Sequence, residues 1–140
     1  MRKSLQILTI LICLFTLNIH AQCGGATITN ITKPTSIGIV IYSNDVETVW
    51  NAIRFANFSK NQGDTVSIFL LGKGVELDNL VKTDMNIKEQ TDSFLKSGGA
   101  ILGCGTCLQS RKINEPQVCK FSSMNDLYDL VRKDKIVMTF

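Results

Sequence analysis

The amino-acid sequence predicts a single α/β domain: a mainly parallel sheet with helices on both faces, which makes a three-layer sandwich. Two observations predict this fold. Near-continuous apolar, β-branched runs recur along the chain, and segments whose apolar residues repeat at helical spacing lie between them. Such runs are typical of strands buried on both faces of a parallel sheet. Strands that alternate with helices favour a parallel sheet covered by helices, and 140 residues fit one domain.

The first predicted strand is 36–42, and a long helix follows it to about residue 61. We expect Asn44 to be the N-cap of this helix, with Glu47 three residues later as in a capping box, and Gly63 to end it. We interpret Trp50 as a core anchor, because a large aromatic side chain on an apolar helix face usually packs. The apolar stripe of this helix consists of Val46, Val49, Trp50, Ile53 and Ala56.

The second predicted strand, 65–71, leads into Gly72-Lys73-Gly74. A G-x-G after a strand can cradle phosphate, but the third glycine of the dinucleotide fingerprint is absent, so we interpret 72–74 as a tight turn. A loop is predicted at 82–85. The other predicted helices are 75–81, 86–97, 106–112 and a helix capped by Ser123 with Asp126, whose apolar stripe is Met124, Leu127, Tyr128 and Val131. The other predicted strands are 100–103, 117–121 and 136–140.

The first residues have the build of a secretory signal peptide. Arg2 and Lys3 precede the apolar stretch 7–17, and a polar break ends in Ala21. We predict cleavage after Ala21, because the stretch is shorter than the roughly 20 apolar residues that span a bilayer. The predicted organisation is therefore a signal peptide at 1–21, an extended segment at 22–35 and the α/β domain at 36–140. A lipid anchor at Cys23 is the alternative to a periplasmic or secreted protein.

Removal of the signal peptide changes which functions are compatible with the sequence. The chain has 15 basic and 12 acidic residues, and the loss of Arg2 and Lys3 leaves a nearly neutral protein. We therefore expect neither nucleic-acid nor membrane-surface binding. The single histidine, His20, is removed as well. This excludes Cys–His and Ser–His–Asp catalysis in the mature protein.

Metal and carboxylate chemistry also find little support. The sequence contains only one C-x-x-C, and Cys23 and Cys119 lack the spacing of a zinc knuckle. We expect no metal and no cofactor. Four acidic residues could in principle act in carboxylate catalysis, but we interpret them as helix caps or parts of solvated faces: Asp45, Glu47, Asp78 and Asp84.

The most informative motif is the C-x-x-C of Cys104 and Cys107, between a predicted strand and a predicted helix. Sites in open α/β sheets lie at the carboxyl ends of strands, and a helix start favours the thiolate that reactive cysteines need. Structural cysteines are the alternative. Cys23, Cys104, Cys107 and Cys119 remain after cleavage and allow three full pairings. One of these pairings joins the neighbouring residues Cys104 and Cys107 in a disulfide, and Cys23 and Cys119 would then form the second disulfide.

From residue 36 onward the chain resembles the DsrE/DsrF/TusD-like family of small sulfur-handling proteins. The resemblance is carried by the first strand and its helix, and by 69–75, 101–111, 123–127 and 135–140. It implies a flavodoxin-like or Rossmann-like sandwich and a homo- or hetero-oligomer, often a trimer or hexamer. It further implies a persulfide on Cys104 and an electropositive neighbour in Arg111. Cys107 would be a resolving thiol or a variant of an inactive site.

Three functions follow from these observations. The first is a sulfur carrier or transferase that holds a persulfide on Cys104, a reversible state of cysteine, and exchanges sulfur with a donor or acceptor protein. The second is a thiol–disulfide redox protein that uses Cys104 and Cys107. The third is a non-catalytic, oligomeric binding module with structural cysteines. Export would separate the protein from the cytoplasmic partners of the family, so we do not expect a role in tRNA thiolation.

Overall fold

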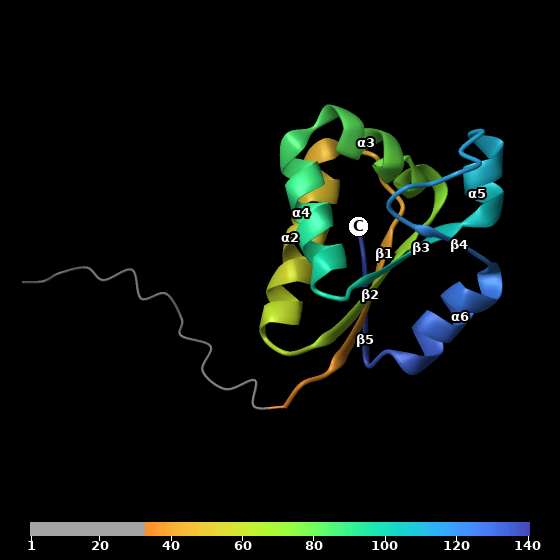
Figure 1. Ribbon diagram of the computed structural model, residues 1–140. Coiled ribbons are helices and arrows are strands. Elements are labelled where there is room, and N and C mark those ends of the chain that lie inside the picture. The colour runs from red at the N-terminus through yellow and green to blue at the C-terminus, as the bar shows by residue number, and fades with distance from the viewer. Residues whose placement is uncertain (1–32) are drawn as a thin grey trace, which may run out of the picture. The chain divides into compact units, whose positions relative to one another are not determined.

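The computed structural model describes residues 33–140, which form a five-stranded, fully parallel sheet in the order β4-β3-β2-β1-β5 (Figure 1). The strands are β1 (Ser36–Ile41), β2 (Thr65–Leu70), β3 (Ala100–Cys104), β4 (Lys120–Ser122) and β5 (Ile136–Thr139). The helices are α2 (Val46–Asn61), the 3₁₀ helix η1 (Gly72–Glu76), α3 (Leu77–Thr83), α4 (Met85–Lys96), α5 (Gly105–Ser110) and α6 (Met124–Lys133). The predicted α/β class is confirmed. The predicted signal peptide and Cys23 lie outside the described residues.

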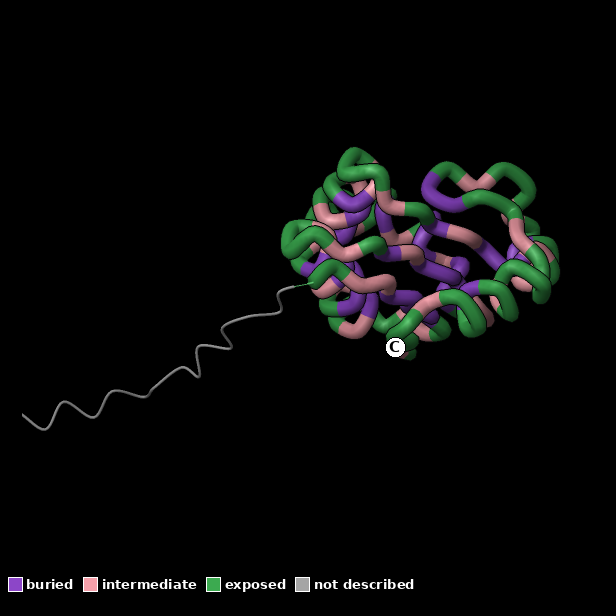
Figure 2. Tube along the Cα trace, turned by 90° about the horizontal axis from the view of Figure 1, so that it is seen from below, coloured by how far each residue is buried: buried purple, intermediate pink, exposed green. Residues whose placement is uncertain are grey.

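Helices cover both faces of the sheet. Helices α2 and α4 pack against each other and against β1, β2 and β3, while α6 lies on the opposite side (Figure 1). Buried residues concentrate along the central strands (Figure 2). The largest fully buried side chains belong to these strands and to the helices against them: Phe69, Phe94, Ile39, Ile41, Ile53 and Ile68. The core therefore lies where the sequence places its β-branched runs.

Glycine at position 38 brings α6 close to the sheet. A Cβ atom at Gly38 would collide with the side chain of Leu130, and it would come within 2.7 Å of Asp134 Oδ2. Leu130 is the buried residue of α6. Because Gly38 has no side chain, Leu130 of α6 can pack directly against β1.

Two predicted boundaries are wrong, and capping explains both. The N-cap of α2 is Asp45, whose carboxylate accepts a hydrogen bond from Thr48 N at 2.9 Å, and not Asn44. The predicted loop 82–85 shrinks to Asp84, because its carboxylate caps α4 by accepting from Ile87 N at 3.0 Å. The predicted helix end is confirmed: α2 stops at Asn61, and Gly63 adopts φ 94°.

The last predicted helix and the strand before it also differ from expectation. Only 120–122 form β4, so Cys119 precedes this strand and does not lie within it. Helix α6 does have the predicted capping box, since Asp126 accepts from Ser123 N at 2.7 Å. Most of its predicted apolar stripe faces solvent, however: Met124, Tyr128 and Val131 are 60%, 64% and 50% exposed. The reason is that α6 packs on the core through Leu130 and the partly buried Leu127, which form only part of its apolar face.

Trp50 only partly fulfils its predicted role. It is half-buried and packs against the edge of the core, and the Arg54 guanidinium lies 5.0 Å from its ring centroid. Its other surroundings form an open hollow of about 490 Å³ that Asp45, Glu47 and Asp84 also line. Two of these carboxylates are the helix caps described above, so the hollow follows from the way α2 and α4 begin.

Candidate functional site

The two cysteines of the C-x-x-C motif lie together at the carboxyl edge of the sheet. Cys104 is the last residue of β3 and the N-cap of α5, and only 5% of it is exposed. Cys107 is half-buried within α5, and its thiol lies beside that of Cys104. Both are free thiols, as is Cys119. The structure thus brings the predicted pair together without the local disulfide, while the alternative Cys23–Cys119 pairing involves an undescribed residue.

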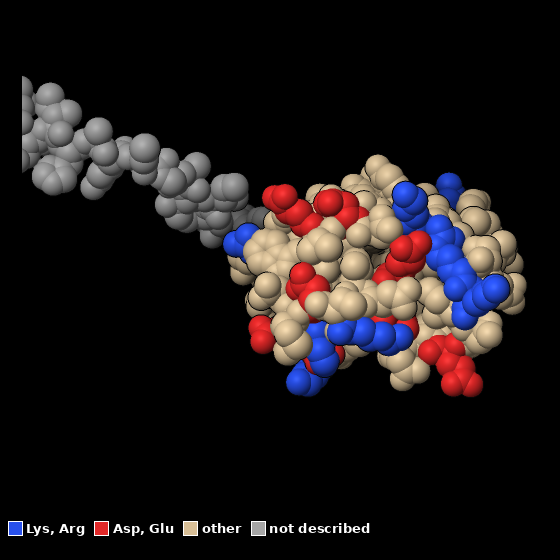
Figure 3. All heavy atoms as spheres, turned by 90° about the horizontal axis from the view of Figure 1, so that it is seen from above, with Lys and Arg blue, Asp and Glu red and all other residues tan. Residues whose placement is uncertain are grey.

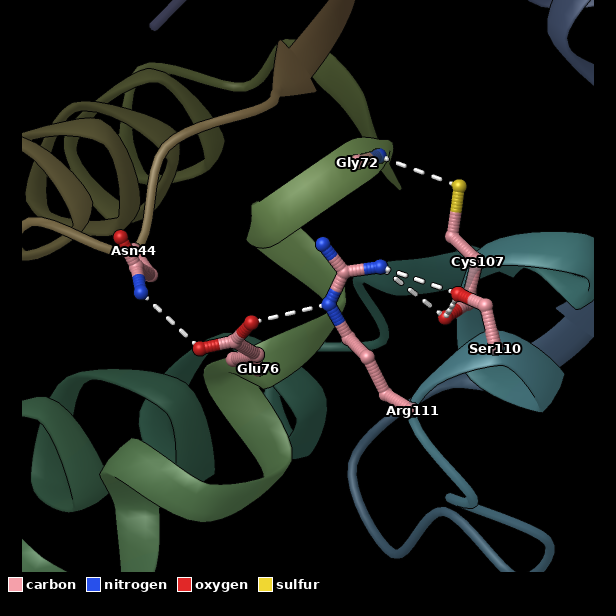
Figure 4. Close-up of polar contacts among 6 residues, drawn as sticks. All are labelled: Asn44, Gly72, Glu76, Cys107, Ser110 and Arg111. Atoms are coloured by element: carbon pink, nitrogen blue, oxygen red, sulfur yellow. Dashed lines mark hydrogen bonds and ion pairs between the residues drawn. The ribbon is translucent and has the colours of Figure 1, made fainter.

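The turn after β2 contacts this thiol pair. Gly72 has φ 56°, and its backbone N–H donates to Cys107 Sγ at 3.3 Å (Figure 4). Burial, and then the neighbouring Cys104 thiol, raise the pKa of Cys107, whereas the Gly72 N–H and the nearby Arg111 act in the opposite direction. The sequence indicated a tight turn at Gly72, but it carried no signal that the turn approaches a cysteine.

Arg111 reaches the site, and an acidic partner holds it there. Its Nε donates to Glu76 Oε1 at 2.8 Å, and its Nη1 donates to the Cys107 carbonyl at 3.3 Å. Glu76 in turn accepts from Asn44 Nδ2 at 2.9 Å (Figure 4). The bonds from Arg111 and then from Asn44 lower the pKa of Glu76. The structure therefore adds two residues, Asn44 and Glu76, that sequence reasoning missed.

Asp78 holds the segment that follows α5, and its predicted place on a solvated face is wrong. It is 1% exposed. Its Oδ1 accepts from the backbone N–H groups of Gln117 and Val118 at 2.5 and 3.1 Å, and its Oδ2 pairs with Lys82 at 3.1 Å. These bonds explain why 117–119 do not join a strand: two of their donors already have an acceptor.

Cys119 lies beneath β3 and apart from the polar groups of the site. Its Sγ is 2.7 Å from the position that a Cβ of Gly103 would take. Burial, together with the charge of Asp78, raises the pKa of Cys119 to about 11. A thiol of this kind is a poor nucleophile at neutral pH.

The surroundings of the two thiols differ from the helix start that the sequence predicts. The predicted helix 106–112 is a shorter helix of six residues, Gly105–Ser110, and Arg111 is its C-cap. The Cys107 sulfur accepts from the Gly72 N–H, and the Cys107 carbonyl accepts from Ser110 Oγ and Arg111 Nη1. Charges of both signs are interspersed on the face seen in Figure 3. Within residues 33–140, no cluster of three potential metal ligands occurs and no helix is long and apolar enough to cross a membrane.

Fold and site together define a small α/β protein with a dithiol at the carboxyl edge of a parallel sheet. The model of the DsrE/DsrF-like family matches residues 35–140, so the chain belongs to this family, which is generally related to sulfur relay. The resemblance drawn from the sequence is thereby confirmed.

One sequence relative and two solved structures are similar to this chain. An uncharacterised protein of Methanopyrus kandleri, MK0008, is 27% identical over 100 residues, which are 67% of this chain and 83% of that protein. The YchN protein of E. coli superposes with a TM-score of 0.66 at 17% identity, over 77% of this chain and all of YchN. BT1422 of Bacteroides thetaiotaomicron, a protein of unknown function, superposes with a TM-score of 0.64 at 21% identity. The match covers 76% of this chain and 95% of BT1422. At these identities the two structures establish the fold.

Proposed function

We propose that this protein is an exported sulfur carrier that holds a persulfide on Cys104. The observation that supports it best is the pair of adjacent free thiols, Cys104 and Cys107, beside the Gly72 N–H. A thiol exchanges sulfane sulfur by forming one S–S bond while the donor's S–S bond breaks. The exchange needs no external oxidant, which suits a site of thiols and nearby polar groups.

A thiol–disulfide redox protein is the second candidate, and the same pair supports it. Cys104 and Cys107 are in contact, so a disulfide between them is a plausible product of oxidation. The two functions differ in mass change: a carrier gains sulfur, whereas a redox protein loses two hydrogens. A purely structural role for the cysteines remains the third candidate.

The location and assembly of the protein are part of the proposal. We propose cleavage after Ala21 and a periplasmic or secreted protein, with a lipid anchor at Cys23 as the alternative. Exposed apolar side chains on α6 and β4 support a homo-oligomer, of the trimeric or hexameric kind that family resemblance implies. The sulfur donor or acceptor would be another protein or a small sulfur compound.

The test is sulfur loading of the purified full chain. The protein is treated with inorganic polysulfide and desalted, and its intact mass is recorded with and without reductant. We expect the wild type to gain one reducible sulfur atom and the Cys104→Ser/Cys107→Ser double variant to gain none. A mass that shows only the loss of hydrogens would contradict the carrier and favour the redox or structural candidates. Equal loading of the double variant would place the chemistry elsewhere.

A further inference from the structure

The two thiols differ in access, and the difference runs against the expected roles. Cys104 is 5% exposed at the end of β3, whereas Cys107 in α5 is only half-buried. We propose that Cys107 is the entry thiol, which meets the sulfur donor and then passes the sulfur inward to Cys104. This inference rests on the proposed carrier function, and it assigns Cys107 a step of its own.

Access decides which thiol can react first. Attack on a sulfane sulfur requires the donor's S–S bond to reach the attacking sulfur, and buried cysteines are inert toward such reagents. A donor that approaches the carboxyl edge of the sheet reaches Cys107 first. Cys104 is then reached only through Cys107 or after a local opening of α5.

The polar contacts of the site also gather around Cys107. The Gly72 N–H donates to its sulfur, and Arg111 donates to its carbonyl while Glu76 holds the guanidinium in place. The Cys104 thiol is the next sulfur in reach, because it lies beside Cys107. The proton that Cys107 loses during attack is taken up by the departing donor sulfur.

Two balanced exchanges describe the transfer. In the first, the sulfur of Cys107 bonds to the terminal sulfur of a persulfide or polysulfide donor, the donor's S–S bond breaks, and the donor leaves as a thiol that takes up a proton. In the second, Cys104 attacks the outer sulfur of the Cys107 persulfide. The new S–S bond replaces the old one, and Cys107 regains its proton. Each step exchanges one S–S bond for another, so neither needs an oxidant or a reductant.

Single variants separate the two thiols in the experiment. Trypsin cleaves after Lys96 and Arg111, so peptide 97–111 contains both thiols, and Cys119 falls in peptide 113–120. The full-length wild type, Cys104→Ala and Cys107→Ala are exposed to inorganic polysulfide for increasing times, quenched with iodoacetamide and digested. Cys119→Ala is the matched control, because it removes a buried thiol outside the pair. Circular dichroism establishes whether each variant is folded. If an alanine variant does not fold, Cys104→Ser or Cys107→Ser replaces it.

The relay predicts an asymmetric result. Cys107→Ala should load sulfur about tenfold more slowly than the wild type, because only the buried Cys104 remains. Cys104→Ala should load at nearly the wild-type rate and keep the sulfur on Cys107, where cyanide removes it faster than from the wild type. Loading of Cys107→Ala at the wild-type rate would overturn the inference, and so would failure of Cys104→Ala to load while the wild type loads.

A second measurement separates this inference from the carrier function itself. Wild-type protein is treated with limiting iodoacetamide without polysulfide, and fragmentation of peptide 97–111 locates the first modification. Modification of Cys107 before Cys104 supports the entry role even if no sulfur is loaded, an outcome that would refute only the carrier. Modification of Cys104 first would overturn the inference whatever the loading result.

Discussion

Glu76 is bonded to both Asn44 and Arg111, and so it connects the segment after β1 with the end of α5. Arg111 and Glu76 side chains are 29% and 31% exposed, so water screens the pair and its contribution to stability is small. Its main effect is on position: Arg111 can donate to the Cys107 carbonyl only while its guanidinium stays between Glu76 and α5. Glu76 is therefore a positioning residue of the proposed site.

Replacement Glu76→Gln should lower the free energy of unfolding by less than about 1 kcal/mol near pH 7. The folded-state pKa of Glu76 is held below its ordinary value of 4.5. The pair therefore stabilises the protein above about pH 4.5, and this stability is lost as pH falls through the lower folded-state pKa. Urea unfolding of wild type and variant between neutral and acid pH measures the difference. It should vanish in acid. Glu89→Gln, the same substitution at an exposed residue of α4, is the matched control.

Sequence reasoning found the part of the site that is local in the chain. Cys104, Cys107 and Arg111 fall within one short segment, so the motif and the resemblance pointed to all three. Gly72 and Glu76 each lie 35 residues from their partners Cys107 and Arg111. Only the parallel alignment of β2 and β3 brings their following turns together, and no local pattern encodes that contact.

At the scale of elements, η1 and α3 act as a brace for α5 and the segment after it. Gly72 contacts Cys107, Glu76 contacts Arg111, and Asp78 binds the N–H groups of Gln117 and Val118. The strands and helices themselves were well predicted, because periodicity and capping are local signals. The segment 113–119 was not, because its backbone bonds to a distant carboxylate and not to a neighbouring strand.

Removal of this carboxylate should loosen the segment. Asp78→Ala leaves two backbone N–H groups without their acceptor, and we expect it to lower the free energy of unfolding by about 3 kcal/mol. Asp78→Asn keeps the oxygen that both groups use and should cost clearly less. Asp92→Ala loses only an ion pair with Lys88 that water screens, so its stability should stay close to that of the wild type.

Urea unfolding measures these three variants, and the rate of Cys119 alkylation reports on the segment itself. That rate should rise in Asp78→Ala and stay low in Asp92→Ala. Equal stability of Asp78→Ala and the wild type would show that the brace contributes little.

At the scale of the whole molecule, the two layers of helices differ in completeness. Helices α2 and α4 cover one face together, while α6 covers the other and leaves apolar side chains in solvent. We define the α6 patch by the exposed apolar residues of this helix: Met124, Tyr128 and Val131. Phe121 of β4, two residues before the N-cap of α6, is also exposed, and its side chain lies 3.5 Å from the position that a Cβ of Gly105 would take. An assembly that also covered Phe121 would lie near the residue that follows Cys104.

Charge in the α6 patch should weaken such an assembly. We expect Tyr128→Glu and Val131→Glu to raise the dissociation constant of a homo-oligomer roughly 30-fold, the effect of losing an apolar anchor at an interface. Sedimentation velocity over a concentration series measures it. Phe58→Glu is the control, because Phe58 is as exposed as Met124 but lies on α2. A monomeric wild type, or equal weakening by Phe58→Glu, would contradict an interface at the α6 patch.

The strand order also sets the timing of folding. β1 lies between β2 and β5, and β5 is the last of the strands along the chain. The Lys135 N–H, just before β5, donates to Ser36 Oγ, which lies 99 residues earlier in the sequence. Phe140 completes the pairing through bonds with Val40 and Tyr42. β5 can therefore join the sheet only after residues 136–140 have been made, and its contacts with β1 join the two ends of the domain. Because contacts between segments this far apart in sequence slow folding, we expect the pairing of β5 with β1 to be a late step.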